Sequence, residues 1–172
     1  MAGWKGAMSD VISSSAPQSQ RTGSIEPRKQ PILVVDDDPV DQEMIVLAFK
    51  RASVENPVIT MGNAQEALEL LDARSRYQWR RVSDLPAVIL LDLNMPQMDG
   101  FEFLRRVKAE ERFAAIPVVV LTTSEFERDL TQSYALGASN YLTKPADFEQ
   151  LVKIAAEVDQ YWCRRNRTPK NG

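Results

Sequence analysis

Five side chains with useful chemistry follow short apolar runs of the sequence. Asp36 and Asp37 come directly after residues 32–35, and Asp92 comes directly after residues 88–91. Thr122 follows a later run of the same kind, and Lys144 follows the predicted strand at 139–143. If the runs are parallel strands, all five side chains lie at the edge of the sheet where the strands end.

Three neighbouring carboxylates repel one another unless a cation lies between them. Mg²⁺ suits such a cluster, because it is a hard ion that binds carboxylate oxygens and keeps several waters. Bound Mg²⁺ neutralises phosphate oxygens during in-line transfer, with Asp92 as the nucleophile. The Thr122 hydroxyl and the Lys144 ammonium are suited to hold the remaining oxygens. The residues therefore predict phosphoryl transfer.

The residues that are missing narrow the function further. None of the 172 residues is a histidine, which excludes a Ser-His-Asp triad, an internal phosphohistidine and a His-ligated metal. The phosphoryl donor must then be another molecule. Cys163 is the single cysteine, so an intramolecular disulfide and zinc sites of paired cysteines are excluded, as fits a reducing cytoplasmic setting.

Short branched apolar runs alternate with amphipathic segments along the chain. We predict five strands and five helices, with Asp38 and Asp147 as helix caps. The strands are residues 32–35, 58–61, 88–91, 117–121 and 139–143, and the helices are residues 39–51, 64–71, 101–110, 125–136 and 147–166. The alternation predicts an α/β fold with a doubly wound parallel sheet.

Composition divides the chain into a domain and two tails. We expect a disordered tail over residues 1–30, a domain over 31–163 and a basic tail over 164–172. The net charge of −3 is made of +2 over 1–31, +4 over 164–172 and −9 between them. An acidic body argues against nucleic-acid binding. No apolar run approaches the ~20 residues of a membrane helix, so no membrane partner is expected.

Four stretches together resemble the receiver domains of two-component response regulators. They are VVDD at 34–37, LLDLNMP at 90–96 followed by Asp99-Gly100, PVVVLT at 117–122 and YLTKP at 141–145. The resemblance covers about residues 31–163. It implies a flavodoxin-like fold with strand order 2-1-3-4-5.

The resemblance also implies a role for each acidic residue. Asp92 is similar to the phosphoacceptor of the family. Asp36 and Asp37 are similar to its acidic pair, which holds Mg²⁺ together with Asp92 and the backbone carbonyl of Asn94. Mn²⁺ or Ca²⁺ is expected to substitute for Mg²⁺ in crystals.

The remaining motif residues are implied to bind phosphate or to switch. Thr122 resembles the catalytic hydroxyl that moves toward the phosphate, and Lys144 resembles the lysine that contacts it. Tyr141 resembles the aromatic residue whose rotamer reports the switch. A cis peptide bond is expected at Pro145.

The chain departs from the common family pattern in three places. Thr123 stands where a smaller Ala or Gly is usual, so we expect restricted access to Asp92. The segment 74–85 is longer than usual, and no output domain follows the last predicted helix. The last two features resemble the small stand-alone regulators of bacterial and cyanobacterial phytochrome kinases. The implied partner is a sensor histidine kinase, with a bacteriophytochrome as the candidate.

Competing functions are less well supported by the residues. An Asp-nucleophile phosphatase needs a second carboxylate two residues after Asp92, and that position is Asn94. A nucleotide-binding protein needs a Gly-rich phosphate loop, which is missing. A receiver-like adaptor is disfavoured by the complete set of acids, threonine and lysine. The basic and aromatic segment 74–81 is interpreted as a surface loop rather than a binding site for nucleic acid or an acidic partner.

The last predicted helix is longer than a single domain needs. Its apolar stripe extends to Trp162, next to Tyr161. An exposed aromatic patch tends to mark an interface, so we predict a homodimer through the fourth helix, the fifth strand and the fifth helix. The alternative is that Trp162 folds back on its own domain.

Overall fold

The computed structural model describes residues 29–72 and 85–165. They form a five-stranded parallel sheet in the order β2-β1-β3-β4-β5, which confirms the predicted fold and strand order. The strands are β1 (Ile32–Val35), β2 (Val58–Met61), β3 (Val88–Leu91), β4 (Val118–Thr122) and β5 (Asn140–Thr143). The predicted tails and the segment 74–85 fall almost wholly outside the described residues.

The three central strands are apolar up to Thr122 at the end of β4, because both faces of the sheet are covered. Every residue of β1, β3 and β4 is buried. β1 lies between β2 and β3, with Val35 opposite Met61 on one side and Leu91 on the other. β1 and β3 therefore end side by side, and their following residues enter the same space.

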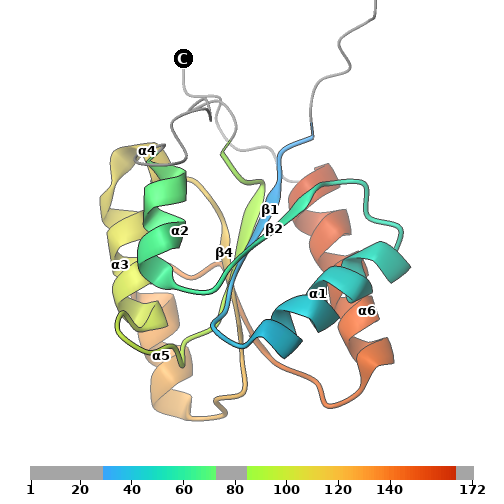
Figure 1. The fold of residues 1–172 in the computed structure, drawn as a ribbon. Helices are drawn as coiled ribbons and strands as arrows, with labels where there is room; N and C mark the ends of the chain where they lie inside the picture. Colours follow the sequence, from blue (N-terminus) through green and yellow to red (C-terminus); the bar gives the residue numbers. More distant parts are fainter. Residues whose placement is uncertain (1–28, 73–84, 166–172) are drawn as a thin grey trace, which may run out of the picture.

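Helices cover the two faces of the sheet in separate groups (Figure 1). One group is α1 (Pro39–Arg51) and α6 (Phe148–Val158), and the other is α2 (Ala64–Leu71), α3 (Gly100–Ala109) and α5 (Glu127–Ala135). Alternate strand residues point to opposite faces, so Ile32 and Val34 join the core under α1 and α6, while Leu33 and Val35 join the other core. Two packed cores hold the sheet rigid beneath the loops at its edge.

Helix starts are fixed by side-chain caps at the positions that the sequence indicates. The Asp38 carboxylate accepts hydrogen bonds from the backbone N–H groups of Val40 and Asp41, with Pro39 as the first helical residue. Asp147 caps α6 in the same way through Glu149 N–H. Both predicted caps are confirmed.

The helix count differs from the prediction. The described residues contain six α-helices rather than five, because the short helix α4 (Glu111–Ala114) lies between α3 and β4. One buried side chain, Phe113, anchors it. The last element also changes type, since α6 ends at Val158 and continues as the π-helix η3 (Asp159–Arg165). Asp159 and Arg164 form an ion pair at the five-residue spacing of a π-helix, with Nε 2.7 Å from Oδ2.

Two further expectations are corrected by the structure. The peptide bond before Pro145 is trans, the isomer that a proline peptide intrinsically favours. Trp162 is half-buried and packs against the core under α1 and α6, so it does not form an exposed patch with Tyr161. Tyr161 stays 59% exposed.

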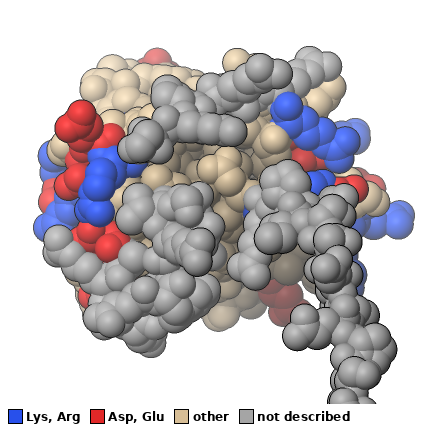
Figure 2. All heavy atoms as spheres, turned by 90° about the horizontal axis from the view of Figure 1, so that it is seen from above, with Lys and Arg blue, Asp and Glu red and all other residues tan. Residues whose placement is uncertain are grey.

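Figure 2 shows basic and acidic side chains next to one another at the sides of the end where the strands begin. No helix in the described ranges 29–72 and 85–165 has the length and apolar character that a membrane crossing requires.

Gly100 fixes the first turn of α3 against the strand end that carries Asp92. A Cβ at Gly100 would lie 2.4 Å from the Asp92 backbone oxygen and 2.7 Å from Leu93 Cα. We predict that Gly100→Ala lowers the free energy of unfolding by about 2 kcal/mol or more, since neither backbone atom can move freely. Urea titration followed by circular dichroism measures this.

Gly62→Ala is the matched control. Its Cβ would meet Gln42 Nε2 at 3.5 Å, which is an ordinary contact. Equal stability losses in the two variants would contradict a specific backbone clash at Gly100.

Candidate functional site

Three carboxylates meet where β1 and β3 end. Asp92 N–H donates to the Val35 carbonyl at 2.9 Å, so the ladder between the two strands continues into the acidic residues. One ligand oxygen from each of Asp36, Asp37 and Asp92 lies within 4.8 Å of the others. Asp36 and Asp92 are buried, and Asp37 is more exposed. The arrangement can supply the oxygen ligands of a hard divalent cation.

Lys144 reaches across the site from the end of β5. Its Nζ lies 2.7 Å from Asp36 Oδ2, 2.6 Å from Asp41 Oδ2 and 3.5 Å from Asp92 Oδ2. Burial on its own lowers the pKa of the Lys144 ammonium, but hydrogen bonds to Asp36 and Asp41 outweigh it and raise that pKa above its usual value. Lys144 is therefore a fixed positive charge at the cluster.

Asp36 is the carboxylate most affected by its surroundings. Burial raises its pKa, and this outweighs the hydrogen bonds from Lys144 and from Asp38 N–H, which lower it. The nearby charge of Asp92 raises it further. A buried carboxylate held in this way gains from any additional cation, which is the electrostatic condition for a metal site.

Thr122 lies at the end of β4, next to the acidic cluster, and is fully buried. Its Oγ1 accepts long hydrogen bonds from Ser124 N–H at 3.4 Å and from Asn94 Nδ2 at 3.5 Å. Asn94 N–H in turn donates to Asp92 Oδ1 at 3.3 Å. The Asn94 carbonyl as a metal ligand stays a prediction. Thr123 has an exposed side chain, and its predicted effect on access to Asp92 is not tested.

The loop after Thr122 is bonded to Tyr141 on β5 and to Asp129 on α5. The Tyr141 hydroxyl donates to the Ser124 carbonyl at 2.9 Å, and the Ser124 hydroxyl donates to Asp129 Oδ2 at 2.5 Å. Partial burial raises the pKa of the Tyr141 phenol, so it stays protonated and keeps its donor. The structure thus places Tyr141 two hydrogen bonds away from the Thr122 hydroxyl.

The structure brings together all of the site residues that the sequence singled out, and it adds one. Asp41 was not predicted to belong to the site, although its carboxylate makes the shortest contact with Lys144. An acidic residue in the first turn of a helix is ordinarily explained by the helix dipole. The sequence therefore shows an acidic residue at position 41, but nothing in it indicates that Asp41 pairs with Lys144, 103 positions away.

Comparison with known proteins defines the class to which this fold and site belong. The family described as "Response regulator receiver domain" matches residues 32–156, and the chain belongs to that family. It is a family of signalling proteins.

Two similar proteins are themselves described as regulators. The chain is 38% identical over 138 residues to the probable methanogenesis regulatory protein FilR2 of Methanothrix harundinacea, covering 80% of this chain and 86% of that protein. It is 34% identical over 138 residues to response regulator Rcp1 of Synechocystis sp., covering 80% and 92%.

Two crystal structures of cyanobacterial-type regulators have the same fold. The phosphorylated cyanobacterial phytochrome response regulator RcpA has a TM-score of 0.75 and 34% identity, over 82% of this chain and 99% of that chain. The Mn²⁺-bound form of Rcp1 has a TM-score of 0.72 and 32% identity, over 81% and 99%.

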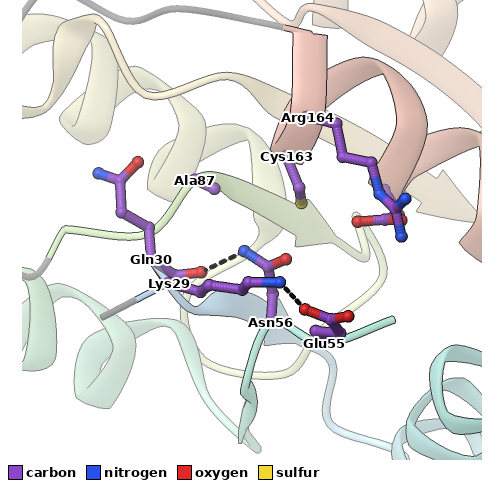
Figure 3. Close-up of a pocket in the computed structure, with 8 residues that line it drawn as sticks. Lys29, Gln30, Glu55, Asn56, Ala87, Cys163 and Arg164 are labelled. Atoms are coloured by element: carbon purple, nitrogen blue, oxygen red, sulfur yellow. Dashed lines mark hydrogen bonds and ion pairs between the residues drawn. The ribbon is translucent and has the colours of Figure 1, made fainter. Parts of the chain in front are cut away.

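A separate cavity of about 190 Å³ lies at the opposite end of the sheet, where β1 and β3 begin (Figure 3). Its polar groups are engaged with one another, because Lys29 pairs with Glu55 and Asn56 donates to the Gln30 carbonyl. Burial chiefly, with the nearby Asp159 charge, raises the pKa of the Cys163 thiol to about 11. The cavity therefore offers neither a free ligand-binding group nor a thiolate at neutral pH.

Removing the Lys144 charge tests the electrostatic balance of the site. We predict that Lys144→Met lowers the free energy of unfolding of the metal-free protein by about 3 kcal/mol at pH 7.5, because Asp36 and Asp92 lose their nearest cation. Without Lys144 the raised pKa of Asp36 rises further, so the folded state binds a proton that the unfolded state does not. The loss should therefore shrink as the pH falls toward 5.

Urea titrations at pH 7.5 and pH 5.5 with EDTA measure both effects. Lys153→Met, which removes an exposed lysine from α6, is the charge-matched control. A destabilisation that is the same at both pH values would contradict the proposed balance.

Proposed function

We propose that this protein accepts a phosphoryl group on Asp92 from a partner histidine kinase, in a Mg²⁺-dependent reaction. The observation that carries the proposal is the convergence of Asp36, Asp37 and Asp92 within 4.8 Å, with Lys144 beside them. A structural site would gain little from three crowded acids. A phosphoryl group, with its own negative charges, requires a cation and an ammonium at that place.

Each residue contributes one step to the proposed transfer. An Asp92 oxygen forms the new bond to phosphorus while the bond from phosphorus to the donor imidazole nitrogen breaks. Mg²⁺, held by Asp36, Asp37, Asp92 and the Asn94 carbonyl, would neutralise phosphoryl oxygens. Lys144 and Thr122 would each hold one further oxygen.

The geometry around Asp92 supports its role as the nucleophile. Oδ1 accepts only a long hydrogen bond from Asn94 N–H at 3.3 Å, and Oδ2 lies 3.5 Å from Lys144 Nζ. Neither oxygen is held as tightly as those of Asp36. The protein acts on its own aspartate, in transfer and in autodephosphorylation, and turns over no separate substrate in this proposal.

The partner is proposed from the similar proteins. RcpA is described as a phytochrome response regulator, and FilR2 as a methanogenesis regulatory protein. We propose a sensor histidine kinase as the partner of this protein, with a bacteriophytochrome as the candidate. The lone Cys163 is consistent with the cytoplasmic location that we propose for this protein.

Chemical phosphorylation tests the proposed function directly. We expect acetyl phosphate with Mg²⁺ to add one phosphoryl group to the protein, as measured by intact-mass spectrometry, and EDTA to prevent it. Asp92→Asn should remove the label because the nucleophile is lost. Undiminished labelling of Asp92→Asn would contradict the assignment, and Glu43→Gln, an exposed change on α1, serves as the control.

We propose that the signal leaves through α5, β5 and α6. Movement of the Thr122 hydroxyl toward a phosphoryl group would pull on the Ser124 loop, which is bonded to Tyr141 on β5 and to Asp129 on α5. Exposed aromatic side chains lie on α5 and on η3, which continues α6: Tyr134 is 46% and Tyr161 is 59% exposed. We propose that this face forms a symmetric homodimer.

The dimer is tested on an exposed residue rather than on the half-buried Trp162. We expect Tyr161→Ala to weaken self-association about tenfold or more, because aromatic side chains carry much of an interface's energy. Analytical ultracentrifugation, with and without phosphorylation, measures it. Val40→Ala, at an equally exposed apolar residue on α1, is the control. A wild type that stays monomeric at high concentration in both states would rule the dimer out.

A further inference from the structure

Asp41 and Lys144 form a contact that the proposed transfer reaction does not use. Asp41 Oδ2 accepts a hydrogen bond from Lys144 Nζ at 2.6 Å. The Lys144 side chain is 12% exposed and that of Asp41 is 38% exposed. The pair therefore lies at the rim of the site, with its cation largely withdrawn from water.

The helix start holds Asp41 in this place. Asp38 caps α1 and also bonds to Asp41 N–H at 3.4 Å, while Pro39 fixes the first turn. Asp41 is outside the cluster formed by Asp36, Asp37 and Asp92. A cation in that cluster would draw on the oxygens of Asp36, whereas Asp41 stays available to Lys144 alone.

The contact also determines how close Lys144 comes to Asp92. An ammonium has three N–H donors, and Asp36 and Asp41 occupy two of them at 2.7 and 2.6 Å. Asp92 is left at 3.5 Å, which is too long for a strong charge-assisted hydrogen bond. A phosphoryl oxygen on Asp92 would extend into the space that remains.

We propose that Asp41 is a positioning residue for the phosphoryl transfer: it holds the Lys144 ammonium away from Asp92, so that an Asp92 oxygen stays free to attack. This inference rests on the proposed function. Without Asp41, the ammonium is no longer drawn toward α1, so it moves closer to Asp92 and forms a direct ion pair with the nucleophile. That pair must then break before the bond to phosphorus forms.

The first experiment observes the contact itself and needs no phosphorylation. In ¹⁵N–¹H spectra of lysine ammonium groups, a hydrogen-bonded and shielded NH₃⁺ gives a slowly exchanging signal. We expect the Lys144 signal, identified by its loss in Lys144→Met, to be present in the metal-free wild type and in Glu43→Gln. In Asp41→Asn it should shift or broaden, and an unchanged signal would overturn the proposal.

The second experiment measures the rate of labelling by acetyl phosphate with Mg²⁺. The Asp92 oxygen bonds to phosphorus, the phosphorus–oxygen bond to acetate breaks, and acetate leaves. We expect Asp41→Asn to slow labelling about three- to tenfold, the effect of losing one partly exposed charge-assisted hydrogen bond. The matched control Glu43→Gln should label at the wild-type rate.

Combining the variants separates positioning from a general effect of charge. If Asp41 acts through Lys144, adding Asp41→Asn to Lys144→Met should cause no further slowing. An unchanged or faster rate in the single variant, or full slowing in the Lys144→Met background, would overturn the proposal. If the wild type takes no label, the proposed function fails and the positioning role with it, while the ammonium spectra still decide whether Asp41 holds Lys144.

Discussion

The balance of negative charge around one ammonium is the interaction on which the rest of this structure depends. Asp36, Asp41 and Asp92 all lie within 3.5 Å of Lys144 Nζ, and Asp37 adds a further carboxylate to the cluster. One cation cannot offset so many acids in a partly buried place. The site therefore carries an excess of negative charge. It is chemically suited to gain a divalent cation and then a phosphoryl group, which brings additional negative charge and needs both cations.

The fold tolerates these crowded carboxylates because its apolar cores stabilise the folded state. The central strands carry no polar residue until they reach the edge of the sheet, and two separate cores clamp them from both faces. The strand order places β1 beside β3, so Asp36 and Asp92 meet by topology rather than by loop conformation. Lys144 comes from the edge strand β5, yet Lys144 N–H donates to the Thr122 carbonyl at 2.8 Å and ties its loop to β4.

Sequence patterns could predict the parts of the molecule that obey strong local rules. Apolar runs marked the central strands, and the acids, Thr122 and Lys144 were identified from their places directly after predicted strands. Asn94 and Tyr141 came from the family resemblance. The rest depended on contacts between distant residues. The helix α4 has only four residues, too few to show a helical period in the sequence. Its one distinguishing feature is the buried side chain of Phe113. The π-helix, in which Asp159 pairs with Arg164, has no pattern in the sequence that marks it. Trp162 could face solvent or its own core with the same sequence pattern.

The hydrogen bonds around Thr122 differ in strength in a way that suits a switch. Thr122 Oγ1 is held only by contacts of 3.4 and 3.5 Å, so little energy opposes its movement toward a new oxygen on Asp92. The Tyr141 hydroxyl is bound more firmly, at 2.9 Å from the Ser124 carbonyl. A shift of the Ser124 loop would therefore move Tyr141 as well, because the hydrogen bond between them is short. In the proposed switch, the loosely held hydroxyl receives the signal, and the firmly held ring passes it to the face formed by α5, β5 and α6.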